Sequence, residues 1–139
     1  MIKQVFDVGN DAWNVTCFYD PVTKEDFIEV SDEIMTLGSE DPMDDLMHLF
    51  DTMDNGYTIS NTDERRSIVV IGHSSSAEQM YDTIQHELKH LVEHISEYYD
   101  VDSKSERAAY LQGEIARNMF VASAMCVCPR CTNGYYIRR

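Results

Sequence analysis

The sequence lacks several features that would place it in a specialised class of protein. No apolar run approaches the roughly 20 residues that cross a membrane as a helix. The opening stretch, MIKQVFDVGN, has neither the apolar segment nor the cleavage-site pattern of a signal peptide. Four cysteines in 139 residues are too few for a secreted disulfide scaffold. We therefore expect a cytoplasmic protein without membrane contact, whose thiols are reduced or bind metal.

Basic residues are also scarce. The chain has 11 lysines and arginines against 25 aspartates and glutamates, a net charge of −14. Residues 1–66 hold 16 acidic and 4 basic side chains, which gives −12 for this part alone. Such a surface repels phosphates, so we expect no nucleic-acid partner. Solubility is the ordinary explanation of the excess, with a basic partner or a DNA-mimic role as alternatives.

The chain has enough apolar residues, 43%, for the core of a single domain over residues 1–139. β-branched and aromatic residues predict strands at 2–8, 13–20, 57–60 and 67–72, the first two forming a hairpin. Apolar residues at helical spacing predict helices at 42–53, 75–99 and 105–124, whereas segment 25–37 fits either state. In the first helix the expected core stripe is Met43, Leu46, Met47, Phe50 and Met53. The sequence therefore predicts an α+β domain.

The segment TIQHELKHLVEHI, residues 83–95, contains a candidate metal site. His86 and His90 are four residues apart, so they lie one turn apart on the same helix face. Two imidazoles in this arrangement can bind one zinc ion, and Glu87 between them can reach a water molecule on the metal. The pattern predicts a zinc site with a general base.

An ordinary solvated helix face is the alternative explanation. The predicted apolar stripe, opposite the histidines, consists of Ile84, Leu88, Leu91 and Ile95. His86 and His90 would then simply face water together with Glu93 and Glu97. The β-prone run SIVVIG directly before this helix favours the zinc site, because a strand followed by a metal-bearing helix is the order that a zinc peptidase requires.

At HELKH the chain resembles the zincin metallopeptidases, which carry HExxH on a helix behind a substrate-binding edge strand. Thr83 and Ile84 before the motif fit the resemblance, and Lys89 departs from it, because zincins usually have an uncharged residue there. The likeness covers roughly residues 67–120 and includes the small peptidases of phages and mobile elements in the ImmA/IrrE-like group. It implies a small zincin-like domain in which N-terminal β-hairpins are followed by the HExxH helix and a packed C-terminal helix.

The resemblance to the gluzincin branch implies that a glutamate on a following helix is the third zinc ligand. Glu106 and Glu114 are the two candidates. Small side chains on one side of that helix would let it pack closely on the HELKH helix, and they include Ala109, Gly113 and Ala116. Glu106 falls on this side, which favours it over Glu114.

Two further residues could contact substrate. Tyr110, one turn after Glu106, could donate a hydrogen bond to a developing oxyanion, although a packed tyrosine is more common. His73, between strand 67–72 and the HELKH helix, could touch substrate, although a loop histidine without a role is the simpler explanation.

The C-terminal segment CVCPRC forms a separate pattern. Cys126, Cys128 and Cys131 could be ligands of a second metal ion. A structural zinc site needs four ligands, and Cys17 is the only other cysteine, so free thiols are the alternative. This divides the domain into an acidic part (1–66), a metal-site core (about 67–124) and a cysteine-containing tail (125–139).

The sequence as a whole favours a small zinc metallopeptidase acting on a peptide or protein. His86, His90 and Glu106 would bind zinc, and Glu87 would be the base that activates water. An extended peptide could add to the edge of strand 67–72. The alternatives are a non-catalytic regulatory protein that contains zinc, or an acidic binding or DNA-mimic protein of a phage or mobile element. The substrate and the oligomeric state stay open.

Overall fold

The computed structural model describes residues 1–9 and 13–126 and confirms a small α+β domain. The helices and strands are, in chain order, β1 (Ile2–Val8), β2 (Trp13–Tyr19), α1 (Lys24–Met35), α2 (Met43–Asp51), β3 (Gly56–Asn61), β4 (Arg66–Ile71), α3 (Ala77–Tyr98) and α4 (Glu106–Cys126). Residues 10–12 and 127–139 lie outside this description.

The described strands form one mixed sheet in the order β1-β2-β4-β3. β1 and β2 make the predicted antiparallel hairpin, and β3 pairs with β4 in antiparallel fashion. β2 and β4 are parallel, from Asn14↔Arg66 to Tyr19↔Ile71. Since β4 has a partner strand on both sides, the expectation that a peptide adds to the edge of the SIVVIG strand is wrong. The edge strand next to β4 is β3.

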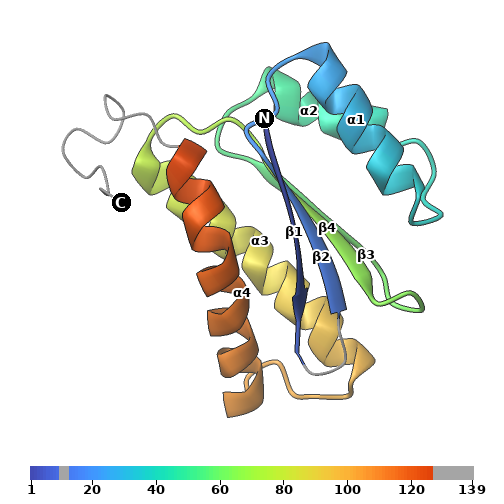
Figure 1. The fold of residues 1–139 in the computed structure, drawn as a ribbon, viewed down its shortest axis with the longest axis vertical. Helices are drawn as coiled ribbons and strands as arrows, with labels where there is room; N and C mark the ends of the chain where they lie inside the picture. The colour runs from blue at the N-terminus through green and yellow to red at the C-terminus, as the bar shows by residue number, and fades with distance from the viewer. Residues whose placement is uncertain (10–12, 127–139) are drawn as a thin grey trace.

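Helices cover both faces of this sheet (Figure 1): α3 and α4 lie on one face, and α1 and α2 lie on the other. Successive side chains of a strand point to opposite faces, so β4 contributes to two cores. Val69 and Ile71 pack with α3 and α4. Ile68 and Val70 pack with α1 and α2. The continuous apolar run of β4 is therefore the run of a strand buried on both faces.

The segment that fits either helix or strand in the sequence forms α1. Thr23 and Asp26 make a capping box: the Thr23 side chain accepts from the Asp26 N–H, and the Asp26 carboxylate accepts from the Thr23 N–H. These bonds satisfy backbone N–H groups at the start of α1, where a helix provides no backbone partner for them. The helix then buries Phe27, Val30 and Ile34, at three- and four-residue spacing.

α2 forms where the sequence predicts a helix, but its buried face differs from the expected stripe. Pro42 is the N-cap residue, and the carboxylate of Asp41, which precedes it, accepts from the Met43 N–H. Leu46 and Leu49 are the buried side chains. Three members of the expected methionine-rich stripe are instead exposed, namely Met47, Phe50 and Met53. A nine-residue helix has too few turns to bury a wide stripe. The face that it buries is the one that carries Leu46 and Leu49.

α3 begins at the cap that the sequence predicts. Ser76 accepts from the Gln79 N–H and starts a helix of 22 residues. The predicted apolar stripe is confirmed, because the residues buried against the sheet and α4 include Ile84, Leu88, Leu91 and Ile95. The stripe fixes the rotation of α3 and hence the direction in which the HELKH side chains point.

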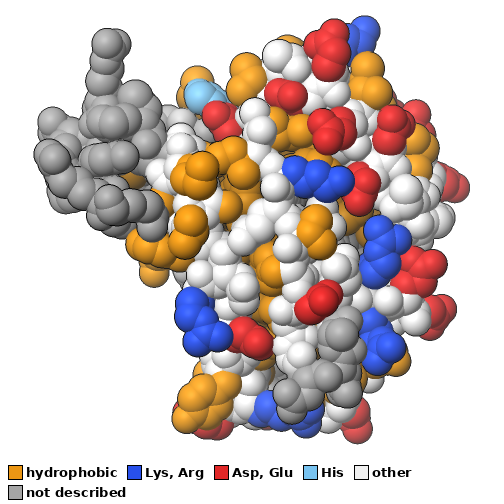
Figure 2. Space-filling model, in the orientation of Figure 1, with side chains coloured by type: hydrophobic (Ala, Val, Ile, Leu, Met, Phe, Trp, Pro, Cys, Tyr) orange, Lys and Arg blue, Asp and Glu red, His pale blue; other side chains and the backbone are white. Residues whose placement is uncertain are grey.

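The acidic part of the sequence covers one side of the molecule. α1 and α2 hold half of its acidic side chains, and Figure 2 shows acidic side chains over these helices. None of the described helices is long and apolar enough to cross a membrane.

Candidate metal centre

The two histidines of HELKH converge on the exposed side of α3. The Nε2 atoms of His86 and His90 are 3.2 Å apart, and the rings meet edge to face at a centroid distance of 4.8 Å. Two nitrogens bound to one tetrahedral zinc ion, each about 2.0–2.1 Å from it, lie about 3.3 Å apart. The pair therefore has the spacing of two zinc ligands. A hydrogen bond between two neutral imidazoles has the same length, with one ring N–H donating to the bare nitrogen of the other.

Glu87 points in the other direction, into the molecule. Its side chain is only 4% exposed, and it is the only charged side chain that the described residues bury. The hydroxyl of Thr58, on β3, donates to Glu87 Oε1 at 2.8 Å. The second carboxylate oxygen, Oε2, lies 3.9 Å from His86 Nε2. The carboxylate therefore lies between the edge strand β3 and the histidine pair.

A glycine on β3 makes room for this carboxylate. A Cβ atom at Gly56 would lie 2.6 Å from Glu87 Cγ and 2.9 Å from Glu87 Cδ. Any larger residue would therefore displace Glu87 or move β3 away from α3. The pair Asn55-Gly56 reads as a turn signal, but Gly56 is the first residue of β3 and its lack of a side chain serves the packing of Glu87.

The solvated-face explanation is correct for part of the motif. His86 and His90 are exposed, and so are Glu93 and Glu97. It does not account for Glu87, because a carboxylate on a purely solvated face would point to water rather than to Thr58. Burial of an ionised carboxylate costs free energy unless hydrogen bonds compensate.

The structure does not bring a third ligand to the histidine pair. No group of three His, Cys, Asp or Glu side chains that could hold a metal ion forms among residues 1–9 and 13–126. Glu106 is the first residue of α4 and follows the C-terminal end of α3. From Tyr98 back to His90 is about 12 Å along a helix axis. Glu114 is held elsewhere, because its carboxylate accepts from the Gly9 N–H.

α4 packs on the sheet and α3 with its apolar face and not with the face of small residues. The buried residues are Ala108, Ile115, Met119 and Ala122. Gly113 lies in open space, with no atom within 4 Å of a Cβ built there. The expectation that Ala109, Gly113 and Ala116 dock α4 closely on the HELKH helix is wrong. The face with the larger apolar side chains packs inward, since it buries more apolar area than a stripe of small residues.

The remaining candidates lie away from the histidine pair. Tyr110 is exposed and lines a cleft between α3 and α4. His73 Nδ1 is 2.8 Å from Asp20 Oδ1, at the other end of β4 from the loop to β3. Cys126 is partly buried, and burial raises the pKa of its thiol to about 11. Cys128 and Cys131 lie outside the described residues.

Cys17, the only cysteine outside the C-terminal segment, lies in the core of the fold. It is fully buried in β2, and burial raises the pKa of its thiol to about 12. Metal binding requires a thiolate, which this environment disfavours.

Sequence reasoning missed a hydrogen-bonded chain beside the site. Ser60 lies opposite Ser67 in the β3–β4 pairing, and their hydroxyls are 2.6 Å apart. His94 Nδ1 lies 2.7 Å from the Ser60 hydroxyl, and Trp13 Nε1 donates to the Ser67 hydroxyl at 2.9 Å. This series of hydrogen bonds joins α3 to β3, β4 and β2. Only the i+4 spacing of His94 from His90 hints at it in the sequence.

Comparison of the chain with known protein families, with curated proteins and with solved structures finds no match.

We predict that Gly56→Ala destabilises the fold by about 1–3 kcal/mol, because the added methyl group collides with buried Glu87. Chemical denaturation measures the change. Gly113→Ala is the matched control and should stabilise by up to about 1 kcal/mol, since it adds a better helix former in open space. Much of the Gly56→Ala loss should disappear when Glu87 is also replaced by alanine; strictly additive effects would contradict the contact.

His94 should make stability depend on pH. Burial, and then the neighbouring charge of His90, hold the pKa of His94 below its ordinary value of 6.5. The native state therefore binds fewer protons than the unfolded state, and stability is lost as the pH falls from about 7 through the native pKa. Between pH 7 and 5, the midpoint temperature of thermal unfolding should decrease less steeply for His94→Gln than for wild type.

Proposed function

We propose that the protein is a small zinc-dependent metallopeptidase of the zincin type. The observation that carries the proposal is the 3.2 Å separation of the His86 and His90 Nε2 atoms beside the Glu87 carboxylate. Neutral imidazole nitrogens are common zinc ligands, and their spacing here fits the metal. The buried Glu87 carboxylate beside the pair is the feature that a purely solvated helix face does not explain.

The third ligand is the incomplete part of this centre. The resemblance to gluzincins implies a glutamate on α4 without choosing between Glu106 and Glu114. We propose Glu106, with Glu114 as the alternative, because the Glu114 carboxylate is engaged by the Gly9 N–H. Glu106 can join the histidine pair only if the first turn of α4 and the connection before it shift toward the middle of α3. Glu114 would have to release the Gly9 N–H and cross to the other side of α3.

Glu87 is the proposed general base. A zinc ion, when bound, supplies Lewis-acid chemistry that lowers the pKa of water and polarises a carbonyl group. Oε2 of Glu87 is the carboxylate oxygen without a hydrogen bond from Thr58, and it faces His86. This oxygen would accept the proton of the attacking water and return it to the leaving amine nitrogen. Thr58 and Gly56 would hold the carboxylate in place.

The edge strand β3 is the proposed binding site for the substrate. β3 pairs with β4 on one side only, and all of its residues are partly exposed. An extended peptide could therefore add to its free edge through backbone hydrogen bonds. Thr58 is in the middle of β3, so a peptide bound there would pass close to the Glu87 carboxylate.

The first test is metal content. Protein purified without chelator or histidine tag should contain zinc by elemental analysis, and His86→Ala or His90→Ala should remove it, because each imidazole supplies a bond that the other cannot replace. His48→Ala is the matched control and should keep the metal. A protein that holds no zinc and takes up none on titration would overturn the proposal.

The same titration identifies the third ligand. Glu106→Gln should weaken zinc binding sharply, whereas Glu114→Gln should have little effect. The opposite result would assign Glu114. If neither variant changes the affinity while both histidine variants do, the two imidazoles bind zinc without a ligand from α4. Zinc retained in the double histidine variant would place the metal elsewhere, with the tail cysteines as the next candidates.

The second test separates catalysis from structure. Glu87→Gln should keep zinc and the fold, because the amide oxygen can still accept from Thr58. Its hydrolysis of a peptide library should fall on the order of a hundredfold or more, since the amide cannot accept a proton. Full activity in this variant would exclude Glu87 as the base. Zinc without hydrolysis in wild type would favour the non-catalytic zinc protein.

A further inference from the structure

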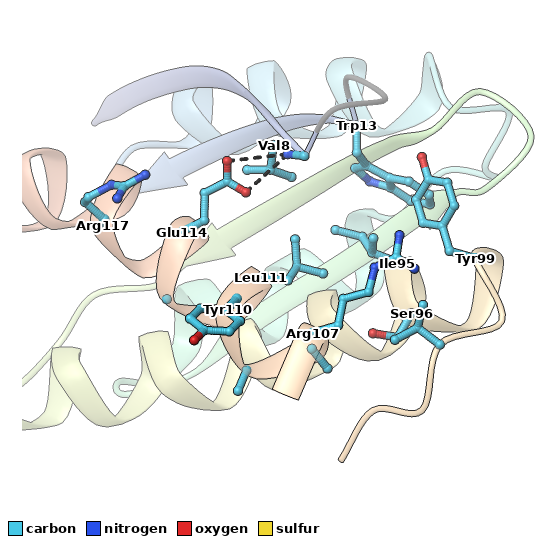
Figure 3. Close-up of a pocket in the computed structure, with 15 residues that line it drawn as sticks. Val8, Trp13, Ile95, Ser96, Tyr99, Arg107, Tyr110, Leu111, Glu114 and Arg117 are labelled. Carbon is cyan, nitrogen blue, oxygen red and sulfur yellow. Dashed lines mark hydrogen bonds between the residues drawn. The ribbon is translucent and has the colours of Figure 1, made fainter. Parts of the chain in front are cut away.

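A cleft between α3 and α4 is separate from the histidine pair. Its volume is about 710 Å³, which is within the range of small-molecule sites, about 300–1,000 Å³. It is bounded by α4, by the C-terminal part of α3 and by the end of the β1–β2 hairpin (Figure 3). Neither His86, Glu87 nor His90 lines it.

Two hydroxyl groups in the wall of this cleft have no hydrogen-bond partner. Among the described residues, the buried side-chain oxygens that lack a partner are those of Ser96 and Tyr99, and both residues line the cleft. Ser96 is only 2% exposed. A buried hydroxyl without a partner costs free energy. Both hydroxyls belong to residues of one wall, so a ligand that reached them could satisfy them.

The charged groups of the cleft are arranged at two ends. Figure 3 shows Arg107 at the end that also holds Ser96 and Tyr99, whereas Glu114 and Arg117 lie toward the other end. Glu114 is engaged by the Gly9 N–H. Neither arginine forms an ion pair with any described residue, in a chain whose net charge is −14. Arg107 is thus a cation without an ion-pair partner at the end of the cleft that also holds Ser96 and Tyr99.

The wall also contains apolar and aromatic side chains. Trp13 and Tyr99 meet edge to face at a centroid distance of 6.1 Å. Val8 and Ile95 are buried, and Leu111 is partly buried. Polar and apolar groups contribute about equally to the surface of the cleft, so a ligand would need both a charged group and an apolar body.

We propose that this cleft binds a small organic anion with an aromatic or branched apolar body, and that the anionic group lies at the Arg107 end. The guanidinium would pair with the anion through charge-assisted hydrogen bonds, and the apolar body would lie along Trp13, Ile95 and Leu111. The site is formed by α3, α4 and the end of the β1–β2 hairpin, and it does not depend on zinc or on peptide hydrolysis.

The chain carries its own reporter for this site. Trp13 is the only tryptophan of the protein and lines the cleft. The probe is 8-anilinonaphthalene-1-sulfonate, which combines an aromatic body with one anionic group. We expect saturable binding at a single site, with energy transfer from Trp13 to the probe. No binding, or binding only at several weak sites, would overturn the proposal.

Two arginine variants test the position of the anion. Arg107→Gln should weaken probe binding about tenfold or more, because a charge-assisted pair is lost. Arg117→Gln removes the same charge from the other end of the cleft and should change the affinity less than threefold. Equal losses in the two variants would show a response to net charge only and would contradict the assigned orientation.

Two further variants test the cleft itself. Gly113→Leu adds a side chain in open space within the cleft wall and should abolish probe binding without unfolding the protein. Ser96→Ala should weaken the binding several-fold, while a hydroxyl without a role in ligand binding would leave the affinity unchanged. Thermal unfolding and zinc content serve as controls. Unchanged probe affinity in Gly113→Leu would overturn the proposal and leave the metal centre untouched.

Discussion

The hydrogen bond between Thr58 and Glu87 is the interaction on which the candidate metal centre depends. It joins the middle of the edge strand β3 to the middle of α3 and compensates the one carboxylate that the described residues bury. Gly56 is part of the same contact, because α3 could not come this close to a larger residue. Leu88, the residue after Glu87, is buried as well, whereas His86 and His90 lie on the exposed side of α3. His86 and His90 therefore face the same region of solvent from adjacent turns.

Local sequence patterns predicted most of the secondary structure. The β1–β2 hairpin and α3 formed as expected, because alternation of apolar residues and a serine cap act over a few neighbouring residues. The segment that became α1 stayed ambiguous, since its capping box lies before the apolar residues and uses an aspartate in place of the more usual glutamate. Patterns of this kind do not specify strand order. β4 lies inside the sheet because β2, from the start of the chain, pairs with it, and nothing within SIVVIG distinguishes that position from an edge.

The candidate site was likewise predictable from local sequence patterns only in part. The i, i+4 spacing of His86 and His90 is a property of one helix and was readable from the sequence. The position of Glu106 depends on which side of α3 receives α4, and that choice is made by Ala108, Ile115 and Met119. Thr58 and Gly56 could not be identified as partners of Glu87, because they approach it only after β3 has joined the sheet. The unpaired hydroxyls of Ser96 and Tyr99 likewise have no signature in the sequence.

The parallel pairing of β2 with β4 has a consequence for how the chain reaches this fold. β1 with β2, and β3 with β4, are neighbours in sequence and can form as separate hairpins. The two hairpins join only when β2 meets β4, across α1, α2 and the whole of β3. Closing so long a loop is slow, because chain entropy is lost before the new contacts compensate for it. Until the hairpins join, α3 has no complete sheet on which to pack. The metal centre and the α3–α4 cleft are therefore expected to be late products of folding.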